Sequence, residues 1–311
     1  MHTTLTVDYQ RKSVRQRIRD SKAIYAFVLP AFVYFIVFRY MPIYFIQVAF
    51  TDYRPTIRVW ESVWVGLDNY RQLLSTPGFL LALRNTFIIA FYKIVFGFPI
   101  PIILAIMINE VRSRPFKRVT QTLVYLPHFI SWSVIGGIMY SLLSVETGIV
   151  NELLKLVGGE PVFFLGDRSY FRGVLVGSDI WKSMGWGTVL YLAAITNIDP
   201  QLYEAATIDG AGRFQRIYHI TLSGIRSTIV VLLIIRLGNV LEVGFEQILV
   251  LGNSMVRPVA DVLDTFVYRV GLQQGRHSVA AAAGLFKTLV AGVLVIASDR
   301  ASKLIGDRGL F

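Results

Sequence analysis

The sequence contains no cysteine, and only 16% of its 311 residues are charged. The missing thiols exclude a disulfide framework, a thiolate metal site, a thiol nucleophile and S-acylation. Soluble domains are typically about 25% charged, so a soluble protein is not favoured either. What the chain does contain is apolar side chains, which make up 54% of it and occur in long runs. We therefore expect a protein that crosses a membrane several times.

The motifs of common enzymes are also absent. The dipeptide Gly-Lys does not occur, which excludes a phosphate-binding P-loop. Neither His-Glu-x-x-His nor Gly-x-Ser-x-Gly is found, and the four histidines lie on separate segments, which does not favour a metal site. The sequence predicts no catalytic, cofactor-binding or metal-binding residue.

Six segments are long and apolar enough to be membrane-spanning helices, because about 20 residues cross the hydrocarbon layer. The third is the cleanest, since no charged side chain occurs from Val119 to Val145. The first contains Pro30, Arg39 and Pro42, so we expect a kink there or an end near Arg39. The predicted fold class is all-α, a polytopic membrane bundle of six transmembrane helices. The six predicted spans are residues 23–49, 85–108, 121–143, 172–195, 227–250 and 279–298.

Lys and Arg outside these spans are twice as frequent on one side of the membrane as on the other. The richer side holds both tails and the loops after the second and fourth spans. Because cytoplasmic loops collect basic residues, both termini are predicted to be cytoplasmic. This topology explains the net charge of +11 without a nucleic-acid partner. The long basic stretch before Ala23 and the lack of a small-residue cleavage site argue against a cleaved signal peptide.

The topology divides the chain into four parts. They are a basic cytoplasmic tail at 1–22, the first span with its extracytoplasmic loop at 23–82, a core of five spans at 83–300, and a cytoplasmic C-terminal tail at 301–311. Within the extracytoplasmic loops we expect short helices at Gly148–Val157 and Val259–Leu272.

The loop between the fourth and fifth spans is predicted to form two short helices. Asp199 suits a helix cap, and Pro200 suits the first helical position, where its missing N–H is not needed. Gly210 favours the left-handed conformation that ends a helix. An apolar face follows, formed by Phe214, Ile217, Tyr218 and Leu222. Periodicity alone is equally typical of a hairpin that packs on the lipid surface.

The spacing of residues in this loop resembles a known motif. Glu204-Ala205-Ala206 is followed after three residues by Gly210, after nine more by Ile220, and after one more by Leu222. The pattern is similar to the EAA loop of permease subunits in binding-protein-dependent ABC importers. One position departs from that family, since Ser223 stands where proline is usual. The resemblance implies that an ATPase subunit is contacted by Glu204, Ala205, Ala206, Asp209, Gly210, Ile220 and Leu222.

Three other stretches resemble the branch of this family that handles complex sugars and polysaccharides, including the permeases of alginate importers. They are residues 125–132, 179–186 and 243–248, and the resemblance extends from about Tyr25 to Ile305. It implies a bacterial inner-membrane subunit that takes up oligo- or polysaccharide delivered by an extracytoplasmic solute-binding protein. The implied partners are a second homologous permease, membrane lipid and a dimer of ATPase subunits that holds ATP and magnesium. The chain itself is then not an enzyme and binds no cofactor.

Ionisable residues inside spans are costly in lipid, so they indicate a cavity, a partner or an ion pair. Asp179 and Lys182 share a helical face and could simply neutralise each other. Arg236 could pair with Glu242 or Glu246, and nearby aromatic rings could belong to interfacial belts or helix packing. The other interpretation is a translocation path for sugars, which combine hydroxyl groups with apolar ring faces. Its candidate residues are Asp179, Trp181, Lys182, Trp186, Arg236, Glu242, Phe245 and Glu246.

The charge inside the spans favours an acidic substrate, because a passing carboxylate offsets part of the desolvation cost of a cation. The four cations are Lys93, Lys182, Arg236 and Lys287, and the alternative is that they pair with carboxylates and hold the bundle together. Two other functions stay open: an ion-coupled secondary transporter that protonates one of those carboxylates, and a membrane-embedded enzyme. Carriers usually contain internal repeats, and residues 1–150 show no convincing similarity to residues 151–311.

Overall fold

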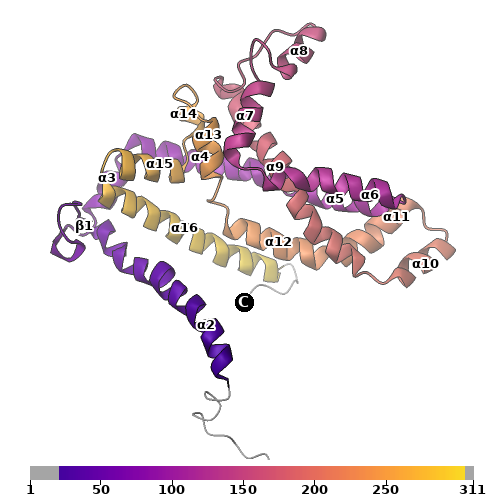
Figure 1. The fold of residues 1–311 in the computed structure, drawn as a ribbon, viewed down its shortest axis with the longest axis horizontal. Helices are drawn as coiled ribbons and strands as arrows, with labels where there is room; N and C mark the ends of the chain where they lie inside the picture. Colours follow the sequence, from indigo (N-terminus) through magenta and orange to yellow (C-terminus); the bar gives the residue numbers. More distant parts are fainter. Residues whose placement is uncertain (1–20, 305–311) are drawn as a thin grey trace, which may run out of the picture.

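The computed structural model describes residues 21–304, and their regular structure is almost wholly helical. The exception is an antiparallel pair of two-residue strands, β1 (Thr51–Asp52) and β2 (Val63–Trp64). The long helices form an elongated bundle, from which α7 and α8 project (Figure 1). The α-helices are α2 (Lys22–Phe35), α3 (Asp68–Leu74), α4 (Pro77–Gly97), α5 (Pro99–Glu110), α6 (Arg114–Tyr125), α7 (Trp132–Leu142), α8 (Ile149–Leu156), α9 (Arg168–Thr196), α10 (Pro200–Ile208), α11 (Arg213–Arg216), α12 (Arg226–Gly238), α13 (Phe245–Leu251), α14 (Arg257–Ala260), α15 (Leu263–Tyr268) and α16 (His277–Leu304).

The first apolar segment stands apart from the bundle. Helix α2 continues through a π-helical turn, η1 (Ile36–Tyr40), into a 3-10 helix, η2 (Met41–Phe50). The irregularity falls around Arg39 and Pro42, where the sequence predicts it. None of the side chains of α2 is buried, and only η2 packs on α16 (Figure 1). A large apolar surface is therefore left for lipid or protein to cover.

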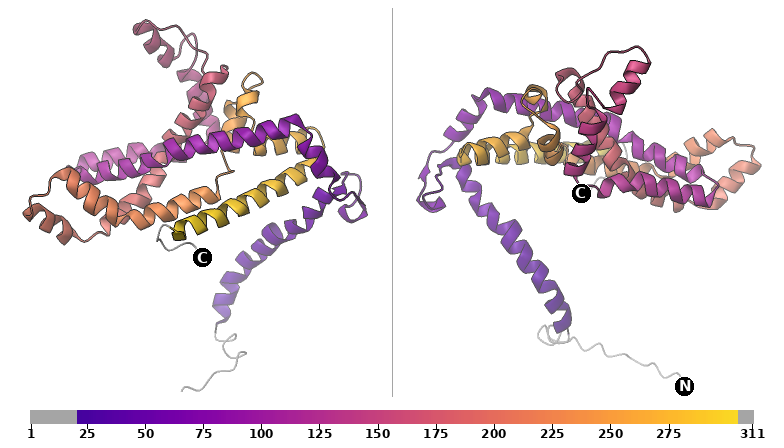
Figure 2. Two further views of the ribbon diagram at one scale, coloured as in Figure 1. Left: turned by 180° about the vertical axis from the view of Figure 1, so that it is seen from behind. Right: turned by 45° about the horizontal axis from the view of Figure 1, so that its top comes forward.

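The second predicted span is one long rod made of α4 and α5 (Figure 2). The third, although it is the most apolar segment, is not a continuous helix. After α6 comes a 3-10 turn, η4 (Leu126–Phe129), and the chain then bends by 106° into α7. Pro127 lacks the N–H that would continue the helix, Ile130 is extended, and Ser131 caps the new helix by accepting from the Val134 N–H. If the chain crosses the membrane at 121–143, as predicted, it does so as a bent pair of helices and not as one continuous helix.

The fifth predicted span, 227–250, is also interrupted. Helix α12 ends at Gly238, and α13 begins after Gly244, whose φ of 94° is disfavoured for residues with a side chain. The fourth span, by contrast, is the single helix α9. The short helix predicted at Gly148–Val157 is confirmed as α8, whereas Val259–Leu272 is divided into the ends of α14, α15 and a π-helical turn, η6 (Arg269–Gln273).

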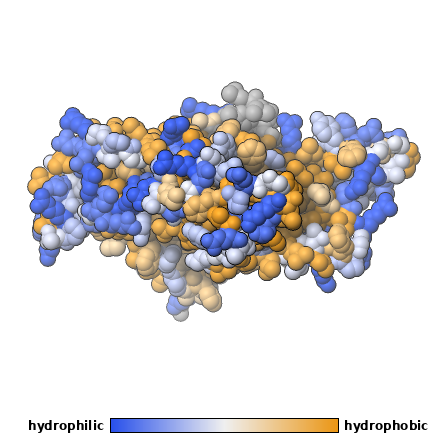
Figure 3. Space-filling view, turned by 90° about the horizontal axis from the view of Figure 1, so that it is seen from above, coloured by the Kyte–Doolittle hydropathy of each residue, from blue (hydrophilic) through white to orange (hydrophobic). Residues whose placement is uncertain are grey.

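Three helices among the described residues are long and apolar enough to cross a membrane: Lys22–Phe50, Pro77–Glu110 and His277–Ala297. Two bent pairs raise the number to five if each pair is counted as one span. Helix α9 is not among them, because Asp179, Lys182 and several glycines dilute its apolar side chains. Hydrophobic side chains cover much of the molecular surface, as expected of a membrane protein (Figure 3).

The core is arranged around α9, which contributes to two of the three buried clusters. Phe171 and Leu175 pack with residues of α4, α13 and the loop before α15. Near the other end of α9, Tyr191 and Ile195 pack with α5 and with Ile225 at the start of α12. The third cluster joins η2, α3, α4, α15 and α16. Helix α9 thus places its polar residues between two well-packed regions.

Candidate functional site

Lys93 of α4 forms a buried ion pair inside the bundle. Its ammonium group lies 2.9 Å from the Asp179 carboxylate, 2.7 Å from the Gln247 side-chain oxygen and 3.0 Å from the Val243 carbonyl. An ammonium has three N–H donors, so all three are used. Gln247 in turn donates to the Leu175 carbonyl on α9. The network therefore ties α4 and α9 to the break before α13.

Asp179 has a second cationic neighbour. The Arg236 guanidinium lies 3.7 Å from the other carboxylate oxygen, and the Arg236 side chain is 46% exposed, against 5% for Lys93. Asp179 therefore pairs with cations from two other helices, and the alternative in which it is neutralised by Lys182 does not hold. Arg236 likewise pairs with Asp179 and not with Glu242 or Glu246.

Lys182 has a different partner, the broken third span. Its ammonium group donates to the carbonyls of Pro127, His128 and Ile130, and it lies 5.6 Å from the centre of the Trp132 ring. The Pro127 carbonyl also accepts from the Ile130 N–H, whereas for the His128 and Ile130 carbonyls at the bend the Lys182 cation is a suitable replacement for a helical N–H. Lys182 thus stabilises the bend between η4 and α7.

The aromatic candidates are distributed over separate places. Trp186 is exposed and stacks on His128, with ring centres 4.9 Å apart. Trp181 instead lines a cavity of about 360 Å³ with Phe164 and Tyr170. Phe245 packs edge-on against Tyr268 at 5.5 Å.

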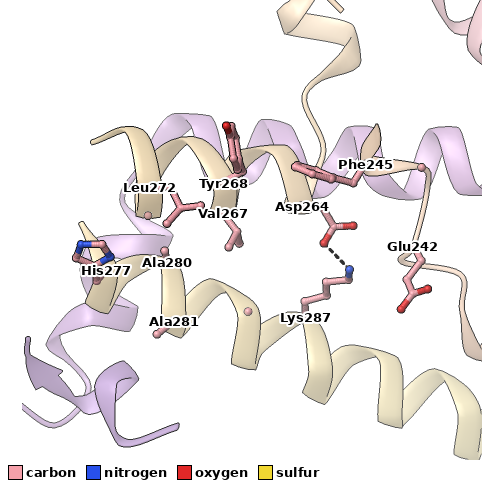
Figure 4. A pocket seen from close by; sticks show the side chains of 13 residues that line it. Glu242, Phe245, Asp264, Val267, Tyr268, Leu272, His277, Ala280, Ala281 and Lys287 are labelled. Atoms are coloured by element: carbon pink, nitrogen blue, oxygen red, sulfur yellow. Dashed lines mark hydrogen bonds and ion pairs between the residues drawn. The ribbon is translucent and has the colours of Figure 1, made fainter. Parts of the chain in front are cut away.

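A cavity of about 880 Å³ lies between α16 and the segment from α15 to η6 (Figure 4). Glu242 and Phe245 are the candidate path residues that line it. An ion pair of Lys287 with Asp264 crosses it at 2.5 Å, and His277 lies at its far end (Figure 4). Sequence reasoning missed Asp264, Tyr268 and His277, because nothing in their spacing relates them to residues 242–245.

The eight candidate path residues therefore do not meet in one cavity of this chain. Asp179 and Arg236 belong to the Lys93 network, Lys182 and Trp186 flank the bend in the third span, and Trp181 lines the smaller cavity. Glu242 and Phe245 face the larger one, while Glu246 is exposed on α13.

The hairpin of α10 and α11 forms at one end of the bundle (Figure 1). The Asp199 carboxylate accepts from the Gln201 N–H at 2.9 Å, and Gly210 has φ of 77°, so both predicted helix boundaries are confirmed. Helix α11 continues as a π-helical turn, η5 (Ile217–Leu222). Ser223 stays helical, and the chain then bends by 60° into α12, so the turn forms without proline.

Two side-chain contacts hold the hairpin in place, and its exposed surface is largely apolar. Arg213 donates to Glu110 at the end of α5 at 2.7 Å, and the Tyr203 hydroxyl lies 2.9 Å from that of Thr221. The large side chains left exposed include Ile208, Phe214 and Tyr218. Such a rigid hairpin with an apolar exposed face has the character of a protein interface.

Within residues 21–304, no group of three or more His, Asp or Glu side chains is placed to hold a metal ion. The architecture is that of a helical membrane permease with broken spans and charged groups between its helices. A model of the family described as "Binding-protein-dependent transport system inner membrane component" matches residues 97–308. The chain belongs to this family, which makes it a permease component of a binding-protein-dependent importer.

The chain is similar to two proteins of Bacillus subtilis (strain 168). It is 44% identical to Protein LplB over 94% of this chain and 92% of that protein. It is 43% identical to the polygalacturonan/rhamnogalacturonan transport system permease protein YteP over 97% of this chain and 94% of that protein. The family and these similarities do not favour an ion-coupled carrier.

Two solved structures match the whole fold. One is a bacterial ABC transporter involved in the import of the acidic polysaccharide alginate, with a TM-score of 0.87 and 42% identity over 94% of this chain and 99% of that one. The other is the bacterial alginate ABC transporter in complex with alginate pentasaccharide-bound periplasmic protein, with a TM-score of 0.88 and 41% identity over 96% of this chain and all of that one. The resemblance stated from the sequence is therefore confirmed.

Proposed function

We propose that this chain is one of two homologous permeases in an ATP-driven importer for an acidic oligo- or polysaccharide. The observation that carries the proposal is its 42% identity, over almost its whole length, to a chain of an importer for the acidic polysaccharide alginate. In the proposed assembly, a solute-binding protein delivers the sugar outside and a dimer of ATPase subunits binds ATP and magnesium inside.

The coupling function is assigned to the hairpin of α10, α11 and η5. Its contact with an ATPase is proposed for Glu204, Ala205, Ala206, Asp209, Gly210, Ile220 and Leu222, together with the exposed Phe214 and Tyr218. The ion pair of Arg213 with Glu110 supports this role, because it links the hairpin to the end of α5. A displacement of the hairpin by the ATPases then moves a membrane-spanning rod as well.

The translocation path is proposed to run between this chain and the second permease, because the candidate residues do not converge within one chain. Arg236 would contact the carboxylates of the sugar, since its half-exposed guanidinium has N–H groups to spare beside the long contact to Asp179. Trp181, Trp186 and Phe245 would face the sugar rings, and Glu242 and Glu246 the hydroxyl groups. Asp179 and Lys182 would not contact the sugar. Asp179 would orient the Arg236 guanidinium, and Lys182 would stabilise the bend in the third span.

For the membrane topology we propose what the sequence predicts: both termini cytoplasmic, a tail at 1–22, the first span and its loop at 23–82, a five-span core at 83–300 and a tail at 301–311. Six crossings result if α9 and both bent pairs each cross the membrane. The broken third and fifth spans suit this proposal, because irregular backbone is tolerated at membrane depth where it lines a cavity.

Reconstitution of the chain with its second permease, ATPases and solute-binding protein tests the proposed function. Proteoliposomes should accumulate labelled uronate oligosaccharide only when ATP and the binding protein are both present. Uptake without ATP, driven by a proton or sodium gradient, would contradict the proposal and support a carrier.

A further inference from the structure

The start of helix α6 carries a local excess of positive charge. Four basic residues occur there within seven positions, and no Asp or Glu occurs between Glu110 and Glu146. None of the four forms an ion pair within residues 21–304. This basic cluster consists of Arg112, Arg114, Lys117 and Arg118, of which the three arginines are exposed. A cluster of cations without acidic neighbours attracts an anionic partner.

Helix α6 is also amphipathic. Phe116, Val119 and Leu123 recur at i, i+3 and i+7 along one face, and they are 61%, 57% and 64% exposed. Because an α-helix turns about 100° per residue, this apolar face points nearly opposite to the basic side chains of the helix. Helix α6 therefore presents an exposed apolar face and a largely exposed basic face to its surroundings.

The basic cluster lies at the end of the bundle that holds the hairpin of α10 and α11 (Figure 1). The contact of Glu110 with Arg213, at 2.7 Å, fixes this position, because Glu110 lies two residues before the cluster. The proposed topology puts this end of the bundle at the cytoplasmic surface. The cluster then lies where the headgroups of the inner leaflet meet water, and the apolar face of α6 continues into the hydrocarbon layer.

The distribution of charge favours a lipid surface over a protein. Helices that lie against membranes carry Lys and Arg on their polar side and large apolar residues on the other, as α6 does. Basic clusters beside a transmembrane segment bind anionic headgroups, which carry charge of one sign over a wide area. The neighbouring hairpin, for which a protein contact is proposed, differs because it contains Asp199, Glu204 and Asp209 beside its arginines. Mixed signs suit a protein surface, whereas the single sign of the basic cluster suits a layer of phosphates.

We propose that the basic cluster binds the headgroups of anionic phospholipids in the cytoplasmic leaflet, while the apolar face of α6 contacts their acyl chains. This inference goes beyond the proposed transport function and uses only its topology. Helix α6 packs on α9 in close backbone contact, since a Cβ atom at Gly185 would overlap the backbone of Val124 and Tyr125. A lipid bound to α6 therefore also restrains α9, the helix around which the core is arranged.

The test uses the importer in nanodiscs, assembled with cysteine-free partner subunits and with a fluorophore on α6 that brominated lipids quench. Val119→Cys provides the attachment site, because the chain otherwise contains no cysteine. Brominated phosphatidylglycerol should quench the fluorophore at a lower molar fraction than brominated phosphatidylcholine. Arg114→Gln/Arg118→Gln should reduce this preference about thirtyfold, the effect of losing two basic residues near an anionic surface. Arg114→Lys/Arg118→Lys is the matched control, because it keeps both charges and should preserve the preference.

Arg112→Gln/Lys117→Gln should weaken the preference as well, so the result does not depend on the folding of one variant. Equal quenching by the two lipids without these substitutions, or an unchanged preference in both Gln variants, would overturn the inference. A photo-reactive amino acid at position 116 should cross-link to lipid; cross-links to an ATPase or to the second permease instead would overturn it too. These measurements need no sugar, ATP or binding protein, so they can succeed when the transport proposal fails and fail when it succeeds.

Discussion

The ammonium group of Lys93 and the carboxylate of Asp179 lie 2.9 Å apart, although 86 residues separate them in the chain. The other two N–H groups of this ammonium donate to the Gln247 side-chain oxygen and to the Val243 carbonyl. Val243 directly precedes Gly244, where the fifth apolar segment breaks. One buried cation thus fixes the positions of two helices and a helix break relative to one another.

Lys93→Met should destabilise the protein by about 3–5 kcal/mol, the usual cost of breaking a buried ion pair. Asp179 would be left with the longer contact to Arg236, and the Val243 carbonyl would lose its donor. Thermal unfolding in nanodiscs measures the effect. Arg71→Gln is the control, because its pair with Asp68 is exposed and should contribute less than about 1 kcal/mol. Equal losses in both variants would contradict the assignment.

The sequence predicted most helices and several of their ends, because these depend on local residues. Asp199 and Gly210 act on the backbone beside them, and the structure has both boundaries as expected. The broken third span was missed because its apolar run hides the effect of Pro127. The His128 and Ile130 carbonyls at the bend accept from Lys182, which is distant in sequence. The partners of Asp179 were missed for the same reason, since i, i+3 spacing cannot reveal contacts between helices.

Lys182→Met should reduce uptake of acidic and neutral oligosaccharides to the same extent. The carbonyls at the bend would lose the Lys182 donor, so the geometry of the third span would change. Recognition of the charge on the sugar would not be affected. Uptake of a uronate oligosaccharide and a neutral one of equal length, in proteoliposomes, measures this. Lys182→Arg should restore part of both activities, because it keeps a cation there. A selective loss of acidic sugar uptake would instead make Lys182 a substrate contact.

The proposed topology predicts the sides of four positions. Reporter fusions after Arg114 and at the C-terminus should report cytoplasm, whereas fusions near Thr76 and Gly158 should report the outside. The distribution of basic residues is the physical reason. A reversed pair would remove the hairpin of α10 and α11 from the side where ATPases bind, and would place the basic cluster of α6 on the outside.

Gly210→Val should uncouple the importer, because a β-branched residue is strained at a φ of 77° and would distort the turn between α10 and α11. Glu204→Lys should act similarly by placing the opposite charge in the proposed contact. The measurement is ATPase activity stimulated by loaded solute-binding protein, alongside copurification of the ATPases. Gly66→Val is the matched control: its φ is 60°, its site is open, and it lies in the loop before α3. If ATPase stimulation in both hairpin variants equalled that of the wild type, the hairpin would only pack on the lipid surface and would not couple to an ATPase.

Arg236→Gln should abolish the preference for acidic sugar while sparing the uptake of a neutral one. Lys93, Lys182 and Lys287 are all engaged at short range, by Asp179, by backbone carbonyls and by Asp264 respectively. Among residues 21–304, the Arg236 guanidinium contacts only the Asp179 carboxylate, at 3.7 Å, so it keeps donors for a passing carboxylate, while Asp179 stays neutralised by Lys93. A hydrogen bond to a charged group contributes about 1.5–3 kcal/mol, so the ratio of acidic to neutral uptake should fall about ten- to hundredfold. Competition between labelled uronate and neutral oligosaccharides of equal length measures that ratio, and Arg236→Lys should retain part of it. An equal loss of both sugars, or a wild type that prefers the neutral one, would show that Arg236 serves the bundle and not the substrate.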